Sequence, residues 1–314
     1  MTTNLRPILL AGPTASGKSA LAMTLAEQSN GCVINADALQ VYDLWRVLTA
    51  RPSEADERRV PHRLYGHIPV STPDYSVGRW LMELDPVLAE CAKSGCRPII
   101  VGGTGLYFKA LTEGLAEIPE TPPPVRAELE LVQKQMGEEA FYTELKRLDP
   151  ETAEQIDQAN PRRVLRAREV FETTGEGLAT WRARTPPPLI PLEDARAFVL
   201  EPPRETLRAG IAQRFDVMLK SGALEEVARL RQLGFDEEDF ARLPGLKALG
   251  APELLAHLAG ESDLDAAIDR AVTATRQYAK RQSTWARNQM SAWMRVELKE
   301  SSKIDPKIVA EMLN

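Results

Sequence analysis

The sequence predicts an α/β fold in which helices flank a parallel sheet, with a helical domain inserted into it. Short apolar runs alternate with amphipathic segments between residues 5 and 112, as in strands joined by crossover helices. A glycine-rich loop, 12–19, separates the first apolar run from the first amphipathic segment. Two proline-rich stretches, 119–124 and 185–191, enclose a charged segment that we interpret as helical.

The first apolar run, Ile8–Ala11, predicts a buried strand, and the loop after it meets every position of the phosphate-binding pattern G-x-x-x-x-G-K-[ST]. Backbone N–H groups of such a loop and of the following helix face an anion together. Lys18 is expected to reach outer phosphate oxygens and Ser19 to ligate Mg²⁺. A glycine turn that merely joins strand to helix is the alternative, and the motif leaves the phosphate compound open. The expected phosphate-binding residues are Gly12, Thr14, Ala15, Ser16, Gly17, Lys18 and Ser19.

Further buried strands are expected where short apolar runs recur, at 32–36 and 98–101. Ligands of a parallel sheet bind beyond the carboxyl ends of its strands. The sequence places Asp37 and Gln40 after one of these strands and the segment 102–105 after the other. We therefore expect these positions and the phosphate-binding loop to form one site.

Asp37 is the carboxylate nearest to a strand end, and it is a candidate general base or metal organiser. A helix N-cap is the alternative role, and the two do not exclude each other. A nucleotide-hydrolysing motor would place an Asp after the strand 98–101, where this chain has Gly-Gly-Thr-Gly instead.

The proline-rich stretches and the change in composition between them set the predicted domain boundaries. The first part of the core spans 1–118, and the helical insertion spans 119–190. The second part, 191–298, opens with another buried strand near 197–200 and continues as helices. The last residues, 299–314, are expected to form a loosely held tail.

Basic residues are unevenly distributed along the chain. A formal net charge of −6 argues against coating nucleic acid by bulk charge, but one structured RNA needs only a local basic face. Four arginines and no acid lie between 160 and 168. A strip without acids on the final long helix suits a phosphate backbone or a diphosphate, and a merely solvated face is the alternative. The strip consists of Thr273, Gln277, Lys280, Thr284 and Arg287.

Arg214 interrupts an apolar stripe. Leu207, Ile211 and Met218 share this stripe at helical spacing, so a guanidinium stands where a core side chain is expected. Such an arginine needs an anionic partner. We prefer a substrate phosphate, and a structural carboxylate is the alternative.

No apolar stretch approaches the roughly 20 residues that a membrane helix needs, so we expect a cytoplasmic protein with no membrane partner. We also expect a monomer. Cys32, Cys91 and Cys96 lack zinc spacing and are expected to be free thiols. The histidines that we expect to be structural or at the surface are His62, His67 and His257.

Five motifs occur in order over nearly the whole chain. They are GPTASGKS at 12–19, DALQVY at 37–42, IIVGGTGLY at 99–107, NPRRVLRAREV at 160–170 and AKRQSTW at 279–285. One motif alone is weak evidence. With all five in this order, the chain closely resembles the bacterial tRNA dimethylallyltransferase family, also called the tRNA isopentenyltransferase family.

This resemblance implies a P-loop kinase-like core and a helical insertion that clasps the tRNA anticodon stem-loop. It implies transfer of a dimethylallyl group from dimethylallyl diphosphate to the N6 amine of the adenosine 3′ of the anticodon. Asp37 would be the general base, Thr104 and Arg214 would assist departure of diphosphate, and the loop 12–19 would hold diphosphate with Mg²⁺. By the same resemblance, the tRNA-binding residues would be Asp37, Ala38, Leu39, Gln40, Thr104, Arg126, Arg162, Arg163, Arg166, Lys280, Arg281 and Gln282.

The chain departs from the family pattern at Ala38, where the family usually has Ser, and at 45–52, where D-I-G-T-A-K-P is usual. These departures concern the RNA contacts more than the reaction. The competing functions are a dimethylallyltransferase acting on AMP, a small-molecule kinase, and an RNA-binding module switched by a nucleotide. The helical insertion with its arginines favours RNA over the first two, and Asp37 together with an intact Lys18 argues against the third.

Overall fold

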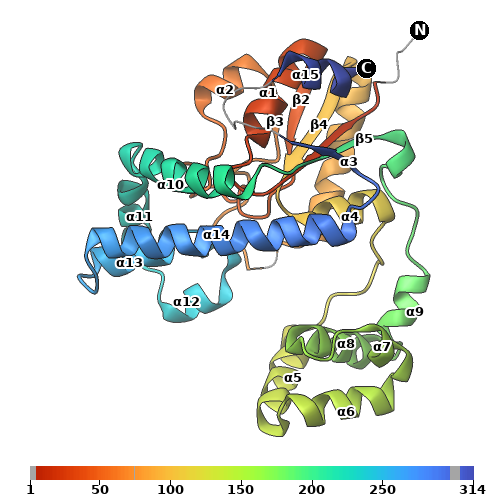
Figure 1. Ribbon diagram of the computed structural model, residues 1–314. Helices are drawn as coiled ribbons and strands as arrows, with labels where there is room; N and C mark the ends of the chain where they lie inside the picture. The colour runs from red at the N-terminus through yellow and green to blue at the C-terminus, as the bar shows by residue number, and fades with distance from the viewer. Residues whose placement is uncertain (1–4, 74, 298–304) are drawn as a thin grey trace. The chain divides into compact units, whose positions relative to one another are not determined.

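A computed structural model describes residues 5–73, 75–297 and 305–314 of the chain (Figure 1). The chain folds into two compact units. The core unit joins Met1–Thr112 to Leu189–Asn314, and the inserted unit is Glu113–Pro188. The predicted insertion, 119–190, differs from this division by a few residues at each end, because the proline-rich stretches do not coincide with the points where the contacts change.

A six-stranded sheet forms the centre of the core unit (Figure 1). In the described part of the chain its strands lie in the order β3-β2-β4-β1-β5-β6, and each pair of neighbours is parallel. The predicted α/β class with a parallel sheet is therefore confirmed. The strands are β1 (Ile8–Ala11), β2 (Gly31–Asn35), β3 (His62–Arg63), β4 (Arg97–Gly102), β5 (Arg196–Leu200) and β6 (Met294–Val296).

Sequence patterns identify the four longer strands but miss the two at the edges of the sheet. β1, β2, β4 and β5 coincide with the apolar runs. β3 and β6 have two and three residues, which is too short for any periodicity to be recognised.

Helices cover the sheet and extend beyond it. Near the sheet they are α1 (Lys18–Ser29), α2 (Glu54–Arg59), α3 (Val77–Ser94), α4 (Gly105–Glu113) and α15 (Pro306–Leu313). The remaining helices of the core unit are α10 (Arg204–Lys220), α11 (Ala223–Gln232), α12 (Glu237–Arg242), α13 (Ala251–Leu258) and α14 (Leu264–Gln289). Short 3-10 turns lie at Leu192–Asp194 and Pro244–Leu246.

Alternate side chains of β1 enter two separate hydrophobic layers. Leu9 packs with Trp80 of α3 and Phe108 of α4 on one face of the sheet. Ile8 and Leu10 pack on the other face, with side chains of α1 and α15. A strand with apolar residues on both faces is the expected pattern for the interior of a parallel sheet.

A third hydrophobic cluster lies among the helices between β5 and β6. It joins α10, α11, α13 and α14 to the long loop after β2. Trp45 of that loop is fully buried in this cluster, and its indole N–H donates to the carbonyl of Gly245. The loop is thus anchored to elements that come some 200 residues later in the chain.

The inserted unit is entirely helical and has a core of its own. Its helices are α5 (Pro123–Met136), α6 (Glu138–Leu148), α7 (Pro150–Gln155), α8 (Pro161–Thr174) and α9 (Leu178–Ala183). Phe141 and Leu145 of α6 meet Val164 and Val170 of α8 at the centre of this core. Asn160 caps α8 by accepting a hydrogen bond from the Arg163 N–H.

The expectation of a loosely held tail is wrong for residues 305–314. These residues contain α15, in which Val309 and Met312 are each 1% exposed and pack against the cluster that contains α1. Arg97 and Arg196 donate to the carbonyls of Leu313 and Glu311 at its end. The apolar residues at i and i+3 bury one face of α15, whereas residues 299–304 of the expected tail lie outside the described residues.

Within the described residues, no helix is long and apolar enough to cross a membrane.

Candidate active site

The phosphate-binding loop connects β1 to α1 through a strained backbone. Gly17, directly before α1, has φ 87°, and Ala15 has φ 62°, a left-handed conformation that is unusual for a residue with a side chain. Such strain persists where surrounding contacts impose it, which is common at ligand-binding loops. A Cβ on Gly12 would lie 3.0 Å from Ser16 Oγ and 3.1 Å from Leu200 Cβ, so Gly12 allows the loop to pack closely on β5.

Ser16 is the one residue of this loop whose side chain is enclosed without a partner. Its hydroxyl is fully buried and forms no hydrogen bond with the described part of the chain. Buried hydroxyl groups are normally satisfied by protein or water. An unsatisfied one inside an anion-binding loop indicates that the loop is built for a ligand.

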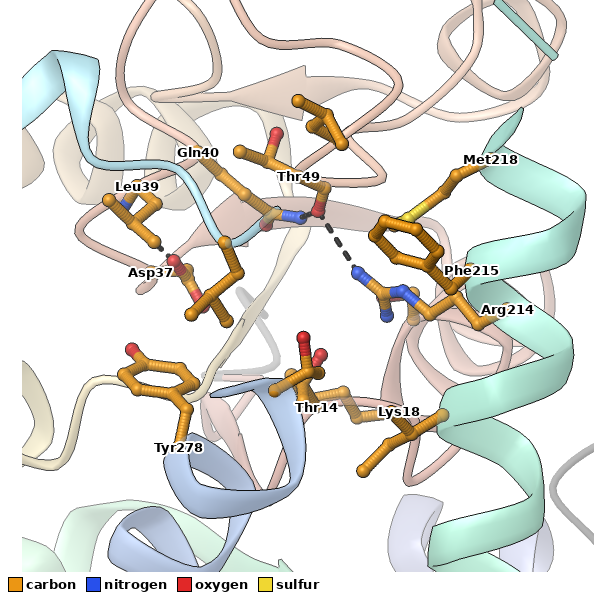
Figure 2. A pocket seen from close by; sticks show the side chains of 15 residues that line it. Thr14, Lys18, Asp37, Leu39, Gln40, Thr49, Arg214, Phe215, Met218 and Tyr278 are labelled. Carbon is orange, nitrogen blue, oxygen red and sulfur yellow. Dashed lines mark hydrogen bonds between the residues drawn. The ribbon is translucent and has the colours of Figure 1, made fainter. Parts of the chain in front are cut away.

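A pocket opens in front of this loop (Figure 2). It is formed by the loop, the segment after β2, the turn near residue 48, α10, α14 and the segment before α13. Its lining residues are Thr14, Lys18, Ser19, Asp37, Leu39, Gln40, Leu48, Thr49, Ile211, Arg214, Phe215, Met218, Leu249, Thr275 and Tyr278. The structure thus brings together Lys18, Ser19, Asp37, Gln40 and Arg214, whereas the segment 102–105, which was expected in the same site, contributes no lining residue.

Two cations share the pocket without an ion-pair partner among the described residues. Burial lowers the pKa of Lys18 from 10.5 to about 8, against the opposing field of Asp37, and its ammonium donates to the Pro13 carbonyl at 3.2 Å. Burial also lowers the pKa of Arg214, whose Nη2 donates to the Thr49 carbonyl at 3.2 Å. Removing two like charges from water is unfavourable unless an anion joins them.

Arg214 therefore lacks the structural carboxylate that was the alternative interpretation of its position, as far as the described residues extend. Its hydrogen-bond partner in the protein is a carbonyl, and its guanidinium faces the pocket (Figure 2). The interpretation as a phosphate ligand stays a prediction, and it is the one that this geometry favours.

Asp37 follows β2 and is held in a tight local turn. Its Oδ1 accepts the N–H of Leu39 at 3.0 Å, and its own N–H donates to Asn35 Oδ1 at 2.9 Å. A turn follows it, not a helix, so the alternative of a helix N-cap is wrong although the carboxylate does cap backbone. Oδ2 accepts no hydrogen bond from the residues described, which leaves this oxygen available for a substrate proton.

Thr104 connects the segments that follow β2 and β4. Its Oγ1 accepts the N–H of Ala38 at 2.9 Å. The segment after β4 approaches closely, because a Cβ on Gly102 would lie 2.0 Å from the Ala36 carbonyl oxygen. Thr104 thus braces the turn that carries Asp37, and it is absent from the residues that line the pocket.

Gln282 of α14 takes a different place from the one expected of a tRNA ligand. Its side chain is buried, its Oε1 accepts the N–H of Thr14 at 2.8 Å, and its Nε2 donates to the Gly103 carbonyl at 3.0 Å. The amide therefore ties the phosphate-binding loop to the loop after β4. Lys280 and Arg281 are exposed, and the Arg281 guanidinium lies 5.7 Å over the Tyr278 ring.

The predicted strip on α14 is exposed to solvent at all five of its positions, namely Thr273, Gln277, Lys280, Thr284 and Arg287. Tyr278 of the same helix lines the pocket, and it was not identified as a site residue from the sequence. Tyr278 lies one turn before Gln282 on α14. Helical periodicity alone does not distinguish a residue that lines a pocket from one that packs in the core.

In the inserted unit, the arginines of α8 divide into two kinds. Arg168 is buried, lies 5.1 Å over the Phe141 ring, and pairs with Glu144 at 2.8 Å and Glu172 at 3.0 Å. This arginine is structural, so the segment 160–168 is not uniformly a phosphate-binding surface. Its acidic partners lie outside the segment 160–168, one on α6 and one in the next turn of α8.

Glu169 holds the guanidinium groups of Arg126 and Arg166. Its carboxylate is buried and lies 3.3 Å from Arg126 Nε and 3.1 Å from Arg166 Nη1, and Arg166 also donates to Thr121 Oγ1 at 2.8 Å. Both arginines remain half exposed. Glu169 therefore fixes their orientation while part of each guanidinium faces solvent.

Arg162 and Arg163 are exposed and occupy the first turn of α8. A helix N-terminus carries partial positive charge, so two cations there are unfavourable for the isolated helix. An anionic ligand would remove that repulsion, which favours a binding role for this pair over a purely solvated one.

Comparisons with known proteins find similar chains. A family model described as IPP transferase matches residues 40–289. The tRNA dimethylallyltransferase of Cereibacter sphaeroides (strain KD131) is 56% identical over 293 residues, which cover 93% of this chain and 89% of the relative. That of Dinoroseobacter shibae is 56% identical over 289 residues, which cover 92% of this chain and 93% of the relative.

Solved structures show the same similarity. The tRNA isopentenylpyrophosphate transferase of Bacillus halodurans superposes with a TM-score of 0.69 at 29% identity, covering 99% of this chain and 95% of that one. A eukaryotic dimethylallyltransferase acting on tRNA superposes with a TM-score of 0.80 at 27% identity, covering 95% of this chain and 75% of that one.

Proposed function

The chain belongs to the IPP transferase family, and we propose that it transfers a dimethylallyl group from dimethylallyl diphosphate to tRNA. The acceptor in this proposal is the N6 amine of the adenosine 3′ of the anticodon, and diphosphate is the second product. Relatives with more than half of their residues identical over nearly the whole chain carry the name of this activity.

The observation that carries the proposal is the charge arrangement of the pocket. Lys18 and Arg214 place two cations at the phosphate-binding loop, and Asp37 presents a carboxylate oxygen without a hydrogen-bond donor from the described chain to the same pocket (Figure 2). A diphosphate ester bound to the cations leaves its carbon end directed away from the loop. A base beside that carbon suits a nucleophile that must lose a proton as it attacks.

These groups account for every bond and for the proton in the proposed transfer. The lone pair of the adenine N6 amine forms a bond to the terminal CH₂ carbon of the donor, and the carbon–oxygen bond to diphosphate breaks. The bonding electrons leave with diphosphate, and the amine proton passes to the Asp37 carboxylate. The N6 lone pair is delocalised into the ring, so the base is needed to raise its nucleophilicity as the proton departs.

Lys18, Arg214 and the loop amides stabilise the charge that develops on the leaving group. Each is preorganised before the reaction, because Lys18 is held by the Pro13 carbonyl and Arg214 by the Thr49 carbonyl. Donors fixed in advance and shielded from water stabilise developing charge more than mobile ones do.

The residues present fit Mg²⁺ that arrives with the diphosphate. Ser19 and Asp37 line the same pocket, and the described residues contain no group of three or more His, Cys, Asp or Glu side chains that could hold a metal ion. Mg²⁺ commonly takes one or two protein oxygens and fills its octahedron with phosphate oxygens and water. When bound, it would supply further positive charge to the leaving group.

The RNA contacts that we propose lie on both units. On the inserted unit they are the exposed Arg162 and Arg163 with the half-exposed Arg126 and Arg166, which offer cations to backbone phosphates. On the core unit they are the segment Asp37–Gln40 with Thr104, and Lys280 and Arg281 of α14. An adenosine that reaches Asp37 must leave its stack, which is easiest in a single-stranded loop.

The test supplies purified protein with Mg²⁺, dimethylallyl diphosphate and an anticodon stem-loop that carries adenosine 3′ of the anticodon. We expect the RNA to gain the mass of one dimethylallyl group and an equal amount of diphosphate to appear. A stem-loop with guanosine at that position is the matched control and should give neither product. RNA-stimulated phosphate release from ATP without a mass gain would overturn the proposal, and so would transfer to AMP in preference to the stem-loop.

A further inference from the structure

Glu226 is a buried carboxylate that binds backbone alone. It lies on α11, is 1% exposed, and accepts three N–H groups from the loop after β2. Its Oε1 accepts from Arg46 at 2.7 Å and Val47 at 3.0 Å, and its Oε2 accepts from Leu48 at 2.9 Å. No cation forms an ion pair with it within the described residues.

A buried charge without a counter-ion is unfavourable unless several donors solvate it. Three consecutive N–H groups do this for Glu226, as they do for an anion at a helix N-terminus. A neutral side chain could anchor a loop with less desolvation. The use of a carboxylate therefore indicates that its charge acts on the loop itself.

The backbone of this loop forms a single turn that leads from Glu226 to the pocket. The N–H of Ala50 donates to the Val47 carbonyl and that of Arg51 to the Arg46 carbonyl, both at 2.9 Å. The turn thus places its first N–H groups on Glu226 and leaves the carbonyls of its last residues at the opposite end. Ala50, with φ 49°, ends the turn in a left-handed conformation.

The carbonyls at that opposite end hold two residues of the pocket. Gln40 Nε2 donates to the Thr49 carbonyl at 2.8 Å and to the Ala50 carbonyl at 3.1 Å. Arg214 Nη2 donates to the same Thr49 carbonyl at 3.2 Å, so this oxygen lies between the two side chains (Figure 2). The negative charge of Glu226 at one end of the turn polarises the peptide groups in the sense that strengthens these acceptors.

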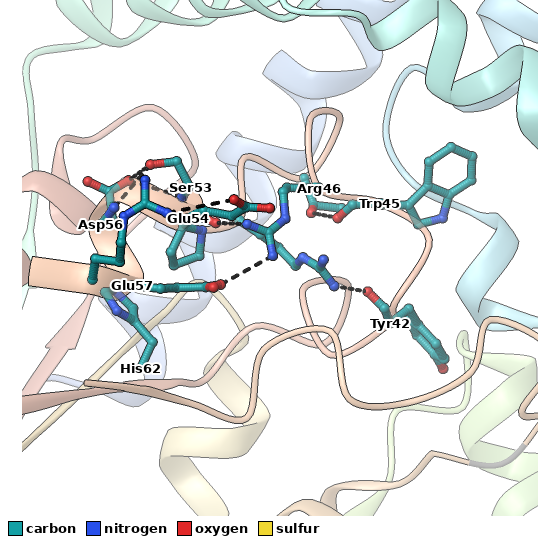
Figure 3. A network of polar contacts seen from close by, with 12 residues as sticks. Tyr42, Trp45, Arg46, Ser53, Glu54, Asp56, Glu57 and His62 are labelled. Carbon is teal, nitrogen blue, oxygen red and sulfur yellow. Dashed lines mark hydrogen bonds and ion pairs between the residues drawn. The ribbon is translucent and has the colours of Figure 1, made fainter. Parts of the chain in front are cut away.

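The long side chains of the turn form no hydrogen bond with Glu226, although its charge opposes the lowering of the Arg51 pKa by burial. Arg46 reaches Glu57 of α2 at 3.4 Å and the Pro52 carbonyl at 3.2 Å, while Arg51 donates to the Tyr42 carbonyl at 2.8 Å (Figure 3). These side chains bond other parts of the chain, and the hydrogen bonds that connect Glu226 with the pocket run through backbone groups.

We infer that Glu226 is a positioning residue for the anion-binding pocket, acting through the turn 46–49 to fix the Thr49 carbonyl that orients Arg214 and Gln40. It touches no pocket surface itself, since it is absent from the lining residues. The inference rests on the proposed function only in taking a diphosphate as the ligand that Arg214 binds.

The test measures binding of inorganic diphosphate with Mg²⁺ to the full chain by calorimetry, for Glu226→Gln, Arg214→Gln and the double variant. Glu226→Gln keeps the volume, removes the charge and turns an NH₂ group toward the Leu48 N–H. We expect it to weaken binding roughly tenfold, the scale of one lost charged hydrogen bond. In the Arg214→Gln background the same change should weaken binding less than about twofold, because the charged side chain that the Thr49 carbonyl orients is gone and the neutral Gln40 alone remains.

Glu225→Gln, on the exposed side of the same helix, is the matched control and should bind as the unaltered protein does. Should Glu226→Gln fail to fold, Glu226→Asp replaces it in the same cycle, since it keeps the charge but shortens the reach. Equal weakening in both Arg214 backgrounds would reduce Glu226 to a general structural role and overturn the inference, as would unchanged diphosphate binding. A protein that binds diphosphate through this cycle without modifying tRNA would overturn the proposed function alone.

Discussion

Asp37 is held through one carboxylate oxygen while the other is left for chemistry. The Leu39 N–H fixes Oδ1, and Asn35 fixes the backbone on either side of the carboxylate by accepting the Asp37 N–H and donating to its carbonyl. A Cβ on Gly103 would lie 3.4 Å from Oδ2, so the absence of a side chain there keeps space beside that oxygen. The orientation of the Asp37 carboxylate is therefore set by local backbone contacts, which a neutral amide can also make.

Asp37→Asn is accordingly expected to leave the fold and tRNA binding nearly intact and to lower single-turnover transfer by about 10²-fold or more, the usual effect of losing a general base. Rapid-quench measurement of labelled stem-loop at saturating donor checks this. Asp216→Asn, an exposed position on α10, is the control for a lost charge. A variant at residue 37 with the transfer rate of the unaltered protein would remove Asp37 from the role of base.

Lys18 supplies a pH dependence whose sign is fixed by its burial. Its pKa lies at about 8, below the usual 10.5, so the free protein loses this charge as the pH rises through about 8. Affinity for diphosphate should be greatest below that pH and should fall above it by up to about tenfold per pH unit, because the anion binds the charged form.

Calorimetry with diphosphate and Mg²⁺ across this range checks the prediction. The control is Lys18→Met, which cannot titrate and reports the ligand's own protonation alone. If the diphosphate affinities of the two proteins change with pH in parallel, Lys18 stays charged over the whole pH range measured. The same shift predicts that folding stability rises with pH above about 8, since the unfolded chain then binds a proton that the folded chain does not.

Sequence patterns could identify the chemical groups of the pocket but not the residues that hold them. Lys18, Asp37 and Arg214 stand out because a charged side chain follows a strand or interrupts an apolar stripe. Thr49 contributes a backbone carbonyl, which every residue has, and Glu226 looks like any acid in the first turn of a helix. Nothing in the local sequence tells such residues apart from neighbours that face solvent.

At the scale of elements, α8 shows how one helix separates a buried, structural arginine from exposed ones. Its periodicity turns Arg168 toward Phe141 and the glutamates, and leaves Arg162 and Arg163 in the exposed first turn. The glutamates that pair with Arg168 come from α6 and from a later turn of α8. A segment without acids in the sequence therefore does not predict a surface without acids.

Replacing both Arg162 and Arg163 with Ala should weaken stem-loop binding and reduce the slope of log affinity against log salt by about one to two units, since each phosphate contact releases counterions. Filter binding across a salt titration measures that slope. Arg147→Ala, an exposed arginine on α6, should change it little and serves as the control. If the double variant and the control have the same slope, the first turn of α8 does not contact phosphate.

In the sheet, length decides what could be predicted. Strands of four or more residues with apolar side chains on both faces are visible as runs, whereas β3 and β6 depend on neighbours that are already in place. The helix α15 was missed for a related reason. Its eight residues bury only one narrow face, and the surface that it covers belongs to α1, at the other end of the chain.

At the scale of the whole molecule, the pocket is assembled from segments separated by most of the chain length. Gln282 ties α14 to the Thr14 N–H and the Gly103 carbonyl, and Trp45 ties the loop after β2 to Gly245. These long-range contacts fix the loops that line the pocket to a rigid core, as preorganised sites require. They also predict that stability and catalysis can be separated wherever a core contact lies away from the pocket.

The contact between α15 and α1 offers that separation. Met312 is 1% exposed and packs in the cluster that holds Leu21 and Leu25 of α1, but α15 contributes no residue to the pocket lining. Met312→Ala should lower the free energy of unfolding by about 2 kcal/mol or more, because it removes buried methylene groups and leaves a cavity that a terminal helix can only partly close. Below the unfolding transition, the transfer rate should not change.

Urea unfolding followed by circular dichroism measures the first quantity and single-turnover transfer the second. Glu311→Ala is the matched control, since its side chain is exposed one position away on the same helix. Equal free energies of unfolding for the two variants would show that the packing of α15 against α1 does not stabilise the fold. A fall in transfer rate with the protein still fully folded would instead mean that α15 sets the position of α1, and through its first turn that of Lys18 and Ser19, so that stability and catalysis would not be separable here.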